Sequence, residues 1–215
     1  AFGRNALQIV STGDYNSAIG DGAGIYITSG SNNCMLGRGS GGNSSPSGNV
    51  STSSNIVCIG NNSITDLYCA DTSISSSDSR DKTDITDFTK GLDWIKALRP
   101  VTYRWDKRSW YGTGVEGASD EFMGTPDGSK KGSRIHVGFL AQEAIEVEKK
   151  FGYGDSKDNM LIANQNEDVE NPSYGMKYER LVPVLVNAIK ELSTKVDTLE
   201  TENTALKARV TTLEG

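Results

Sequence analysis

Hydroxyl, amine and guanidinium groups occur together in one short stretch of the sequence, Ser76-Ser77-Asp78-Ser79-Arg80-Asp81-Lys82. Peptide cleavage that uses neither a metal nor a cysteine needs a nucleophile, a base that takes its proton, and donors for the oxyanion. Serine–lysine pairs are an established form of this chemistry. A lysine acts as a base only where desolvation or a nearby positive charge lowers its pKa. Arg80 is a candidate for that charge or for the oxyanion donor.

Other reactive side chains point to no second site. The three cysteines (Cys34, Cys58 and Cys69) form no CxxC pair, and their odd count favours reduced thiols over a disulfide framework or zinc site. The sequence has one histidine, His136, so a histidine-rich metal site is excluded. His136 itself is expected to be a hydrogen-bonded strand residue. Residues 37–42 are glycine-rich but lack the Lys-Ser/Thr of a phosphate loop. We therefore predict no metal and no cofactor.

Two further sets of side chains are given structural roles. Gln142 and Glu143 are expected to make a buried polar contact to which no reaction can be assigned. Trp94, Trp105 and Trp110 are expected to be core or interface aromatics.

The distribution of charge divides the 215 residues into three parts. The net charge of −6 argues against binding to nucleic acid or to an anionic membrane. No run of about 18 apolar residues occurs, so membrane insertion is not expected. Only six of the charged residues lie in residues 1–76, where glycine, serine and asparagine dominate. Residues 77–181 have an ordinary globular composition, and residues 182–215 have the pattern of a long helix.

A loose repeat organises residues 1–76. Ser17-Ala18-Ile19-Gly20, Cys34-Met35-Leu36-Gly37 and Val57-Cys58-Ile59-Gly60 each end a short apolar run with glycine, and a small or polar pair follows. Short strands closed by such turns are typical of β-solenoids, whose rungs need stacking or partner chains. We predict a β-rich fibre segment, with disorder as the alternative.

A strict heptad pattern marks residues 182–215. The a positions are Val182, Ile189, Val196, Asn203 and Val210, and the d positions are Leu185, Leu192, Leu199, Leu206 and Leu213. Opposite charges at g and e (Lys195–Glu200, Glu202–Lys207 and Arg209–Glu214) favour parallel, in-register chains. The a and d residue types suit a dimer, whereas residues 209–214 match the Arg-apolar-x-x-apolar-Glu pattern of short trimeric coiled coils. We predict a parallel trimer; the alternative is an amphipathic helix packed on its own domain.

Residues 77–181 are predicted to mix helices and strands. The spacing of apolar residues predicts a helix over 84–98, interrupted at Gly91 and ended by Pro100. Strands are predicted over 101–105 and 135–140, separated by a long polar loop over 106–134. A further helix is predicted over 141–151.

Four ordered motifs of this region resemble a known family. They are Ser76-Ser77-Asp78-Ser79-Arg80-Asp81-Lys82, Gly91-Leu92-Asp93-Trp94-Ile95, Leu98-Arg99-Pro100-Val101-Thr102-Tyr103 and Gly138-Phe139-Leu140-Ala141-Gln142-Glu143. The family is the endosialidase-type intramolecular chaperone domain of phage tail fibres and spikes, and the resemblance covers about residues 77–215. It implies a domain that trimerises, templates the folding of an upstream β-rich fibre and then cuts itself off. It also implies helices and long hairpins that wrap the fibre.

The resemblance also implies a site. The nucleophile of the family matches Ser77 and the base matches Lys82, so the scissile bond is Ser76–Ser77, with Asp78 and Arg80 in supporting roles. Their spacing does not put Ser77 and Lys82 on one face of a continuous helix, so a turn or a lysine from a neighbouring protomer must bring them together. Asp81 stands where the family commonly has an apolar residue, and it is expected to face solvent or to pair with Arg80.

The sequence therefore predicts an α+β chain in three parts: a β-solenoid-like fibre segment (1–76), a mixed chaperone domain with long hairpins (77–181) and a parallel coiled coil (182–215). The expected partners are two further copies of the chain and its own upstream fibre, with a host-surface receptor as a further candidate. Assembly is expected in the host cytoplasm and the final location in the virion. The competing interpretations are an uncleaved fibre tip that binds a receptor and a trimerisation cap without chemistry.

Overall fold

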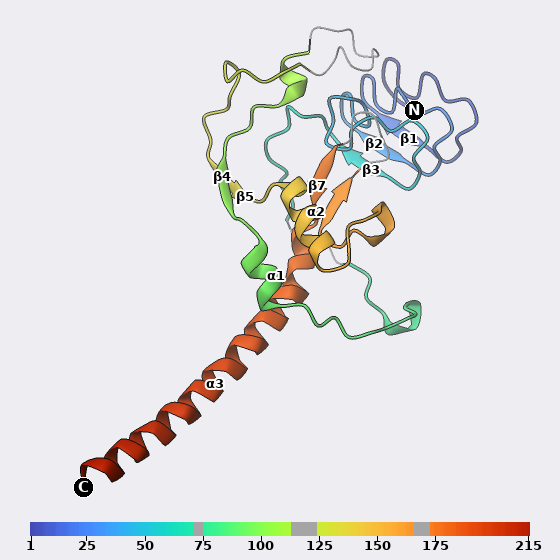
Figure 1. Ribbon diagram of the computed structural model, residues 1–215. Coiled ribbons are helices and arrows are strands. Elements are labelled where there is room, and N and C mark those ends of the chain that lie inside the picture. Colours follow the sequence, from blue (N-terminus) through green and yellow to red (C-terminus); the bar gives the residue numbers. More distant parts are fainter. Residues whose placement is uncertain (71–74, 113–123, 166–172) are drawn as a thin grey trace. The chain divides into compact units, whose positions relative to one another are not determined.

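The computed structural model describes residues 1–70, 75–112, 124–165 and 173–215 of the chain, which form two compact units. The first unit contains the described parts of Ala1–Ile74, Thr102–Val137 and Gln165–Tyr174. The second contains Ser75–Val101, Gly138–Asn164 and Gly175–Gly215. Small sheets and helices are combined, so the fold is mixed α/β (Figure 1).

A stack of three short parallel strands organises the first unit. β1 (Ser17–Ile19), β2 (Cys34–Leu36) and β3 (Val57–Ile59) pair in the order β1-β2-β3 (Figure 1). Ala18 pairs with Met35, which pairs with Cys58, so the register matches each strand to the next apolar run of the sequence. The three runs predicted as strands are therefore the strands of this sheet.

The core of this unit is small because each strand buries only its central residue. Alternate side chains of a strand point to opposite faces, so Ala18, Met35 and Cys58 share the inner face. They pack with the other buried residues of the cluster, which are Ala23, Ile27 and Val50. Cys58 is thus a free thiol in a hydrophobic core, whereas Cys69 is exposed.

Polar ladders hold the turns between the strands. The Asn33 side chain is buried; its amide donates to Asn16 Oδ1 at 3.0 Å and to the carbonyl of Ser53 at 2.9 Å. Its own Oδ1 accepts the backbone N–H of Ile56 at 3.0 Å. Stacking also brings glycine onto glycine: a Cβ at Gly20 (φ +131°) would lie 2.6 Å from the carbonyl carbon of Gly37. This close approach explains why an apolar run ends in glycine at this position.

Two further sheets contain two short strands each. β4 (Val101–Tyr103) pairs with β5 (His136–Gly138), and β6 (Ala163–Gln165) pairs with β7 (Tyr174–Met176). The strands predicted over 101–105 and 135–140 are present but shorter. Part of the predicted long loop, residues 113–123, lies outside the described residues, and its first part contains the 3₁₀ helix Arg108–Trp110.

The helix predicted over 84–98 is wrong in its first half. α1 comprises Leu92–Ala97, with Gly91 at its N-terminus. Asp84 has a φ of +52°, which no helix contains. The carbonyls of Phe88 and Lys90 accept hydrogen bonds from the Asn187 side chain, at 2.5 and 3.3 Å, instead of from a helical turn. A tertiary contact therefore overrides the helical spacing of apolar residues in this segment.

The core of the second unit surrounds Trp94 of α1. Its indole is fully buried and stacks on Phe151 with ring centroids 5.0 Å apart. α2 (Ala141–Lys150) and the long helix α3 (Leu181–Glu214) complete the unit, with 3₁₀ turns at Lys157–Asn159 and Tyr178–Arg180. The buried residues of the Trp94 cluster are Trp94, Ile162, Leu181 and Val184.

A buried carboxylate connects α2 to the segment that follows it. Glu148 is fully buried and accepts backbone N–H groups from three consecutive residues, Leu161, Ile162 and Ala163, at 2.7, 2.9 and 2.6 Å. Charge-assisted hydrogen bonds offset the cost of removing the carboxylate from water. Glu148 thereby holds the chain that enters β6 against the end of α2.

α3 carries one set of buried apolar residues and one set of exposed apolar residues. Leu181, Val184 and Ala188 are buried and face the core of the second unit, beside α1 (Figure 1). The nine apolar residues at the predicted a and d positions keep between 43% and 85% of their surface exposed. The helix itself was predicted correctly, but the residues that contact its own unit are not those of the heptad stripe. No helix among the described residues is long and apolar enough to cross a membrane.

Candidate active site and the contacts around it

A short 3₁₀ turn brings Lys82 back to Ser77. The turn comprises Ser79–Asp81 and is capped by Asp78, whose carboxylate accepts the backbone N–H of Arg80 at 2.9 Å. Lys82 closes the turn by donating its backbone N–H to the carbonyl of Ser79 at 3.3 Å. Its Nζ then donates to Ser77 Oγ at 2.7 Å and to the Ser77 carbonyl at 3.2 Å. The two side chains thus meet within one chain, by the first of the two predicted routes.

Arg80 is paired inside the same turn. Its guanidinium donates from Nε and Nη2 to the Asp78 carboxylate, and the Nη2–Oδ2 distance is 2.6 Å. The hydrogen bonds from Arg80 hold the pKa of Asp78 below its ordinary value, and the same contact raises the pKa of Arg80. The charge of Arg80 is therefore balanced by Asp78, and Asp81 is an exposed neighbour of Lys82.

The whole stretch from Ser75 to Asp87 is exposed. Ser77 and Lys82 are thus close enough for proton transfer, yet water surrounds them in the single chain. A serine–lysine pair that cleaves peptides needs a less polar environment around the amine. The single chain brings the two side chains together and leaves both of them exposed.

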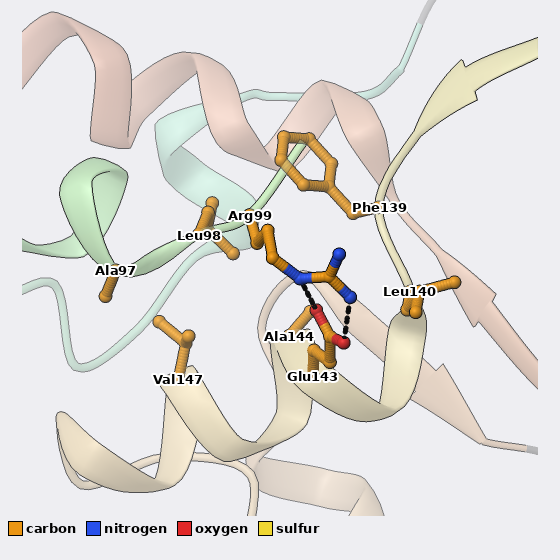
Figure 2. Close-up of a pocket in the computed structure, with 8 residues that line it drawn as sticks. All are labelled: Ala97, Leu98, Arg99, Phe139, Leu140, Glu143, Ala144 and Val147. Carbon is orange, nitrogen blue, oxygen red and sulfur yellow. Dashed lines mark hydrogen bonds and ion pairs between the residues drawn. The ribbon is translucent and has the colours of Figure 1, made fainter. Parts of the chain in front are cut away.

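A second contact joins two of the sequence motifs. Arg99 follows α1, and its guanidinium grips the Glu143 carboxylate of α2 with two hydrogen bonds, one of them Nε to Oε2 at 3.0 Å (Figure 2). The Arg99 contact lowers the pKa of Glu143. Both side chains are partly exposed, at 61% and 44%. The expectation of a buried contact at Glu143 is therefore wrong: the carboxylate forms an ion pair at the surface.

Apolar side chains line the shallow hollow beneath this ion pair. Leu98, Phe139 and Leu140 surround it together with Ala144 and Val147 of α2 (Figure 2). Its small size leaves no room for a substrate. The ion pair and this hollow therefore join the segment after α1 to the start of α2 within the second unit.

A third group of contacts connects residues 62–66 to the segment 105–134 within the first unit. Lys107 Nζ donates to the carbonyl of Asn62 at 2.7 Å, and the Asn62 side-chain amide donates to Ser109 Oγ at 3.2 Å. Arg134 pairs with Asp66 at 3.2 Å. No sequence signal marked these residues, because 45 or more positions separate the partners.

The remaining candidates have structural surroundings. His136 lies on β5, where its ring stacks on Tyr103 at 5.5 Å and meets Trp105 edge-on at 6.2 Å. Trp94 is a core residue as predicted, whereas Trp105 is 47% exposed. Residues 37–42 form the turn after β2, with Ser40 bonded to the Gly37 carbonyl at 2.9 Å. Among the described residues, no group of three or more His, Cys, Asp or Glu side chains is arranged to hold a metal ion.

The middle region of the chain matches a known family. Residues 77–153 match the model of the Peptidase S74 family, described as the chaperone of endosialidase. The match begins at Ser77 and includes α1, β4, β5 and α2. This part of the chain is thus an endosialidase-type chaperone domain, as the four motifs predicted. No curated protein matched the chain.

Proposed function

We propose that this chain is part of a homotrimeric phage fibre or spike, in which residues 77–215 assist the folding of residues 1–76. The domain then cuts the chain at Ser76–Ser77. The observation that carries the cleavage proposal is the 2.7 Å distance between Lys82 Nζ and Ser77 Oγ, at the first residue of the family match. The final location of the fibre part is the virion, after assembly in the host cytoplasm.

The support for a fibre segment is the strand stack of residues 1–70. Parallel strands in register, each burying one residue, fit the rungs of a β-solenoid, in which neighbouring rungs supply the core. Such a stack has high contact order for its size, because every strand pairs with one 17 or 23 residues away. Slow pairing of this kind benefits from a template that holds the chains together while the rungs form.

The support for trimerisation is the uncovered stripe of α3. The helix already uses Leu181, Val184 and Ala188 to contact its own unit, so the exposed a and d residues are available to a different partner. Opposite charges at the e and g positions fit a second and third copy of the same helix in parallel register. The coiled coil raises the effective concentration of the three fibre segments at one end.

The cleavage step follows from the position of Ser77 just after the scissile bond. Lys82 in its neutral form takes the Ser77 Oγ proton, and Oγ attacks the carbonyl carbon of Ser76. The Ser77 nitrogen leaves with that proton, which gives an ester between Ser76 and the Ser77 side chain. Water then hydrolyses the ester, and the products are a carboxylate on Ser76 and a free amine on Ser77.

Assembly of the trimer supplies the less polar environment that the single chain lacks. Ser77 and Lys82 are exposed, so we infer that neighbouring chains of the trimer cover the pair and remove water from the amine. Cleavage is then linked to completed assembly, and loss of the template leaves the fibre kinetically stable.

Intact-mass measurement of the full chain tests this function. The wild type is expected to yield two fragments, 1–76 and 77–215, while Ser77→Ala and Lys82→Met stay whole. Ser79→Ala, an exposed serine of the same turn, is the matched control and should be cut like the wild type. A wild type that stays whole after prolonged incubation as a trimer overturns the cleavage proposal. That outcome favours an attached fibre tip that binds a receptor, or a trimerisation cap without chemistry.

A further inference from the structure

One compact unit contains segments from both sides of the proposed cut. The fibre part of Ala1–Ile74 and the chaperone segment Thr102–Val137 belong to the same unit. Cleavage of Ser76–Ser77 breaks none of the contacts inside this unit. The cut therefore leaves intact the noncovalent contacts that hold the two products together.

One group of these interactions is centred on Asn62. Its carbonyl accepts from Lys107 Nζ at 2.7 Å, and its side chain donates to Ser109 at 3.2 Å, so both polar ends of Asn62 are bound by the chaperone segment. The Lys107 ammonium also lies 5.0 Å from the ring of Trp105 and 5.7 Å from that of Trp110. A partly buried cation between two indoles interacts more strongly than an exposed one. Burial also lowers the pKa of Lys107.

A second interaction lies a few residues further along the fibre part. Arg134 Nη1 is 3.2 Å from Asp66 Oδ1, while Asp66 Oδ2 accepts the Thr65 hydroxyl at 2.8 Å. Both members of the ion pair are largely exposed, so solvent screens it and its contribution is smaller. Together the two interactions hold residues 62–66 at both ends.

We propose that these contacts form a latch that keeps the chaperone bound to the fibre after the cut, so that release is a separate, salt-sensitive step. The latch consists of Lys107, Ser109 and Arg134 on the chaperone side and Asn62 and Asp66 on the fibre side. The inference rests on the proposed function. Before the cut the latch is intramolecular, and the covalent link keeps its partners at high effective concentration. After the cut that link is gone, so the two products separate once the latch opens. In a trimer three latches act in parallel and prolong the association.

Separate measurements of cutting and release test the latch on the full chain. A denaturing gel follows cleavage, and size-exclusion chromatography with light scattering follows the association of the products. At low salt the cut wild-type products are expected to elute together, and in about 1 M NaCl to separate, because salt screens the charged contacts. Lys107→Ala should speed separation by roughly tenfold or more, the effect of losing a charged hydrogen bond in an interface. Lys107→Met, which keeps the apolar stem between the indoles, should act in the same direction.

Lys131→Ala is the matched control, since Lys131 is an exposed lysine of the same segment. Products that separate as fast as they are cut at low salt would overturn the latch. So would equal separation rates for Lys107→Ala and Lys131→Ala.

A second variant keeps the latch testable if the chain does not cut itself. A recognition sequence for a site-specific protease is inserted between Ser75 and Ser76 in the Ser77→Ala background. Digestion then makes the same two products by another route. If the wild type stays whole, self-cleavage is rejected. If the digested variant forms a slowly dissociating, salt-sensitive complex, the latch is supported. If the wild type cuts itself and the products of both proteins separate at once, self-cleavage is supported and the latch is rejected.

Discussion

Gly91 lies so close to α3 that an added Cβ would be 2.6 Å from the backbone nitrogen of Ala188. The Glu191 carboxylate accepts the N–H of Leu92 at 3.1 Å and so caps α1 from the same helix. α1 therefore begins where it does because α3 passes directly beside it. Gly91 is thus one of the residues through which α1 contacts the long helix.

Gly91→Ala is expected to destabilise the second unit by about 1–3 kcal/mol, because α1 must move away from α3 to accommodate the methyl group. Urea unfolding monitored by Trp94 fluorescence measures the change. Gly175→Ala is the control, since a Cβ there meets nothing within 4 Å. Equal midpoints for the two variants would show that α3 tolerates the extra group.

Glu148→Gln should lower the free energy of unfolding by about 1–3 kcal/mol. The amide retains one acceptor oxygen, but its NH₂ group faces backbone N–H donors that the carboxylate satisfied. Hydrogen exchange should accelerate at Leu161, Ile162 and Ala163 in the variant. Glu146→Gln, on the exposed side of the same helix, should leave these amides protected. Unchanged protection in Glu148→Gln would contradict the anchoring role.

The Arg99–Glu143 pair predicts a dependence of stability on acid. Because Arg99 lowers the pKa of Glu143 below its ordinary 4.5, the pair stabilises the folded chain above that pH. This stabilisation is lost as the pH falls through the lowered pKa. Glu143→Gln, which cannot ionise, should lose less stability than the wild type between about pH 6 and pH 3. The effect is small because both side chains are partly exposed.

Thermal unfolding at a series of pH values checks this dependence. Arg99→Met should flatten the acid dependence in the same way, since it removes the cation and leaves Glu143 with an ordinary environment. Identical acid dependence in the wild type and Glu143→Gln would mean that the pair contributes nothing.

Leu199→Asp is expected to abolish trimerisation, because three carboxylates would meet at one d layer of the coiled coil. Sedimentation equilibrium of the full chain at micromolar concentration measures the mass. Thr198→Asp, one position earlier and off the a and d stripe, should stay trimeric. A monomeric wild type, or a trimeric Leu199→Asp variant, would refute the role given to α3.

The elements predicted correctly share a local cause. The three strands of the stack, α2 and α3 follow from apolar spacings of two, three and four residues, which reflect the geometry of strand and helix. Gly91 and Asn187 show why the first half of the helix predicted over 84–98 was wrong. A hydrogen-bond partner 99 residues away is not encoded in local spacing.

The residues of the candidate site and of the contacts around it also fall into those that the sequence identified and those that it did not. Ser77 and Lys82 were identified from residue types and family motifs, because both belong to one short segment. Glu148, Lys107 and Asn62 carried no such signal; a single buried glutamate or a lysine in a polar loop becomes significant only when its partners are known.

The amino-acid order alone determined the three strands of the stack, α2 and α3, where a serine and a lysine stand close in the chain, and which stripe of the last helix is apolar. These properties depend on neighbours within a few residues. Only the tertiary structure decided that α3 contacts α1 with its other face and leaves the heptad stripe exposed. It also decided that residues 62–66 bind the segment 105–134, because packing selects among long-range contacts that local periodicity leaves equally possible.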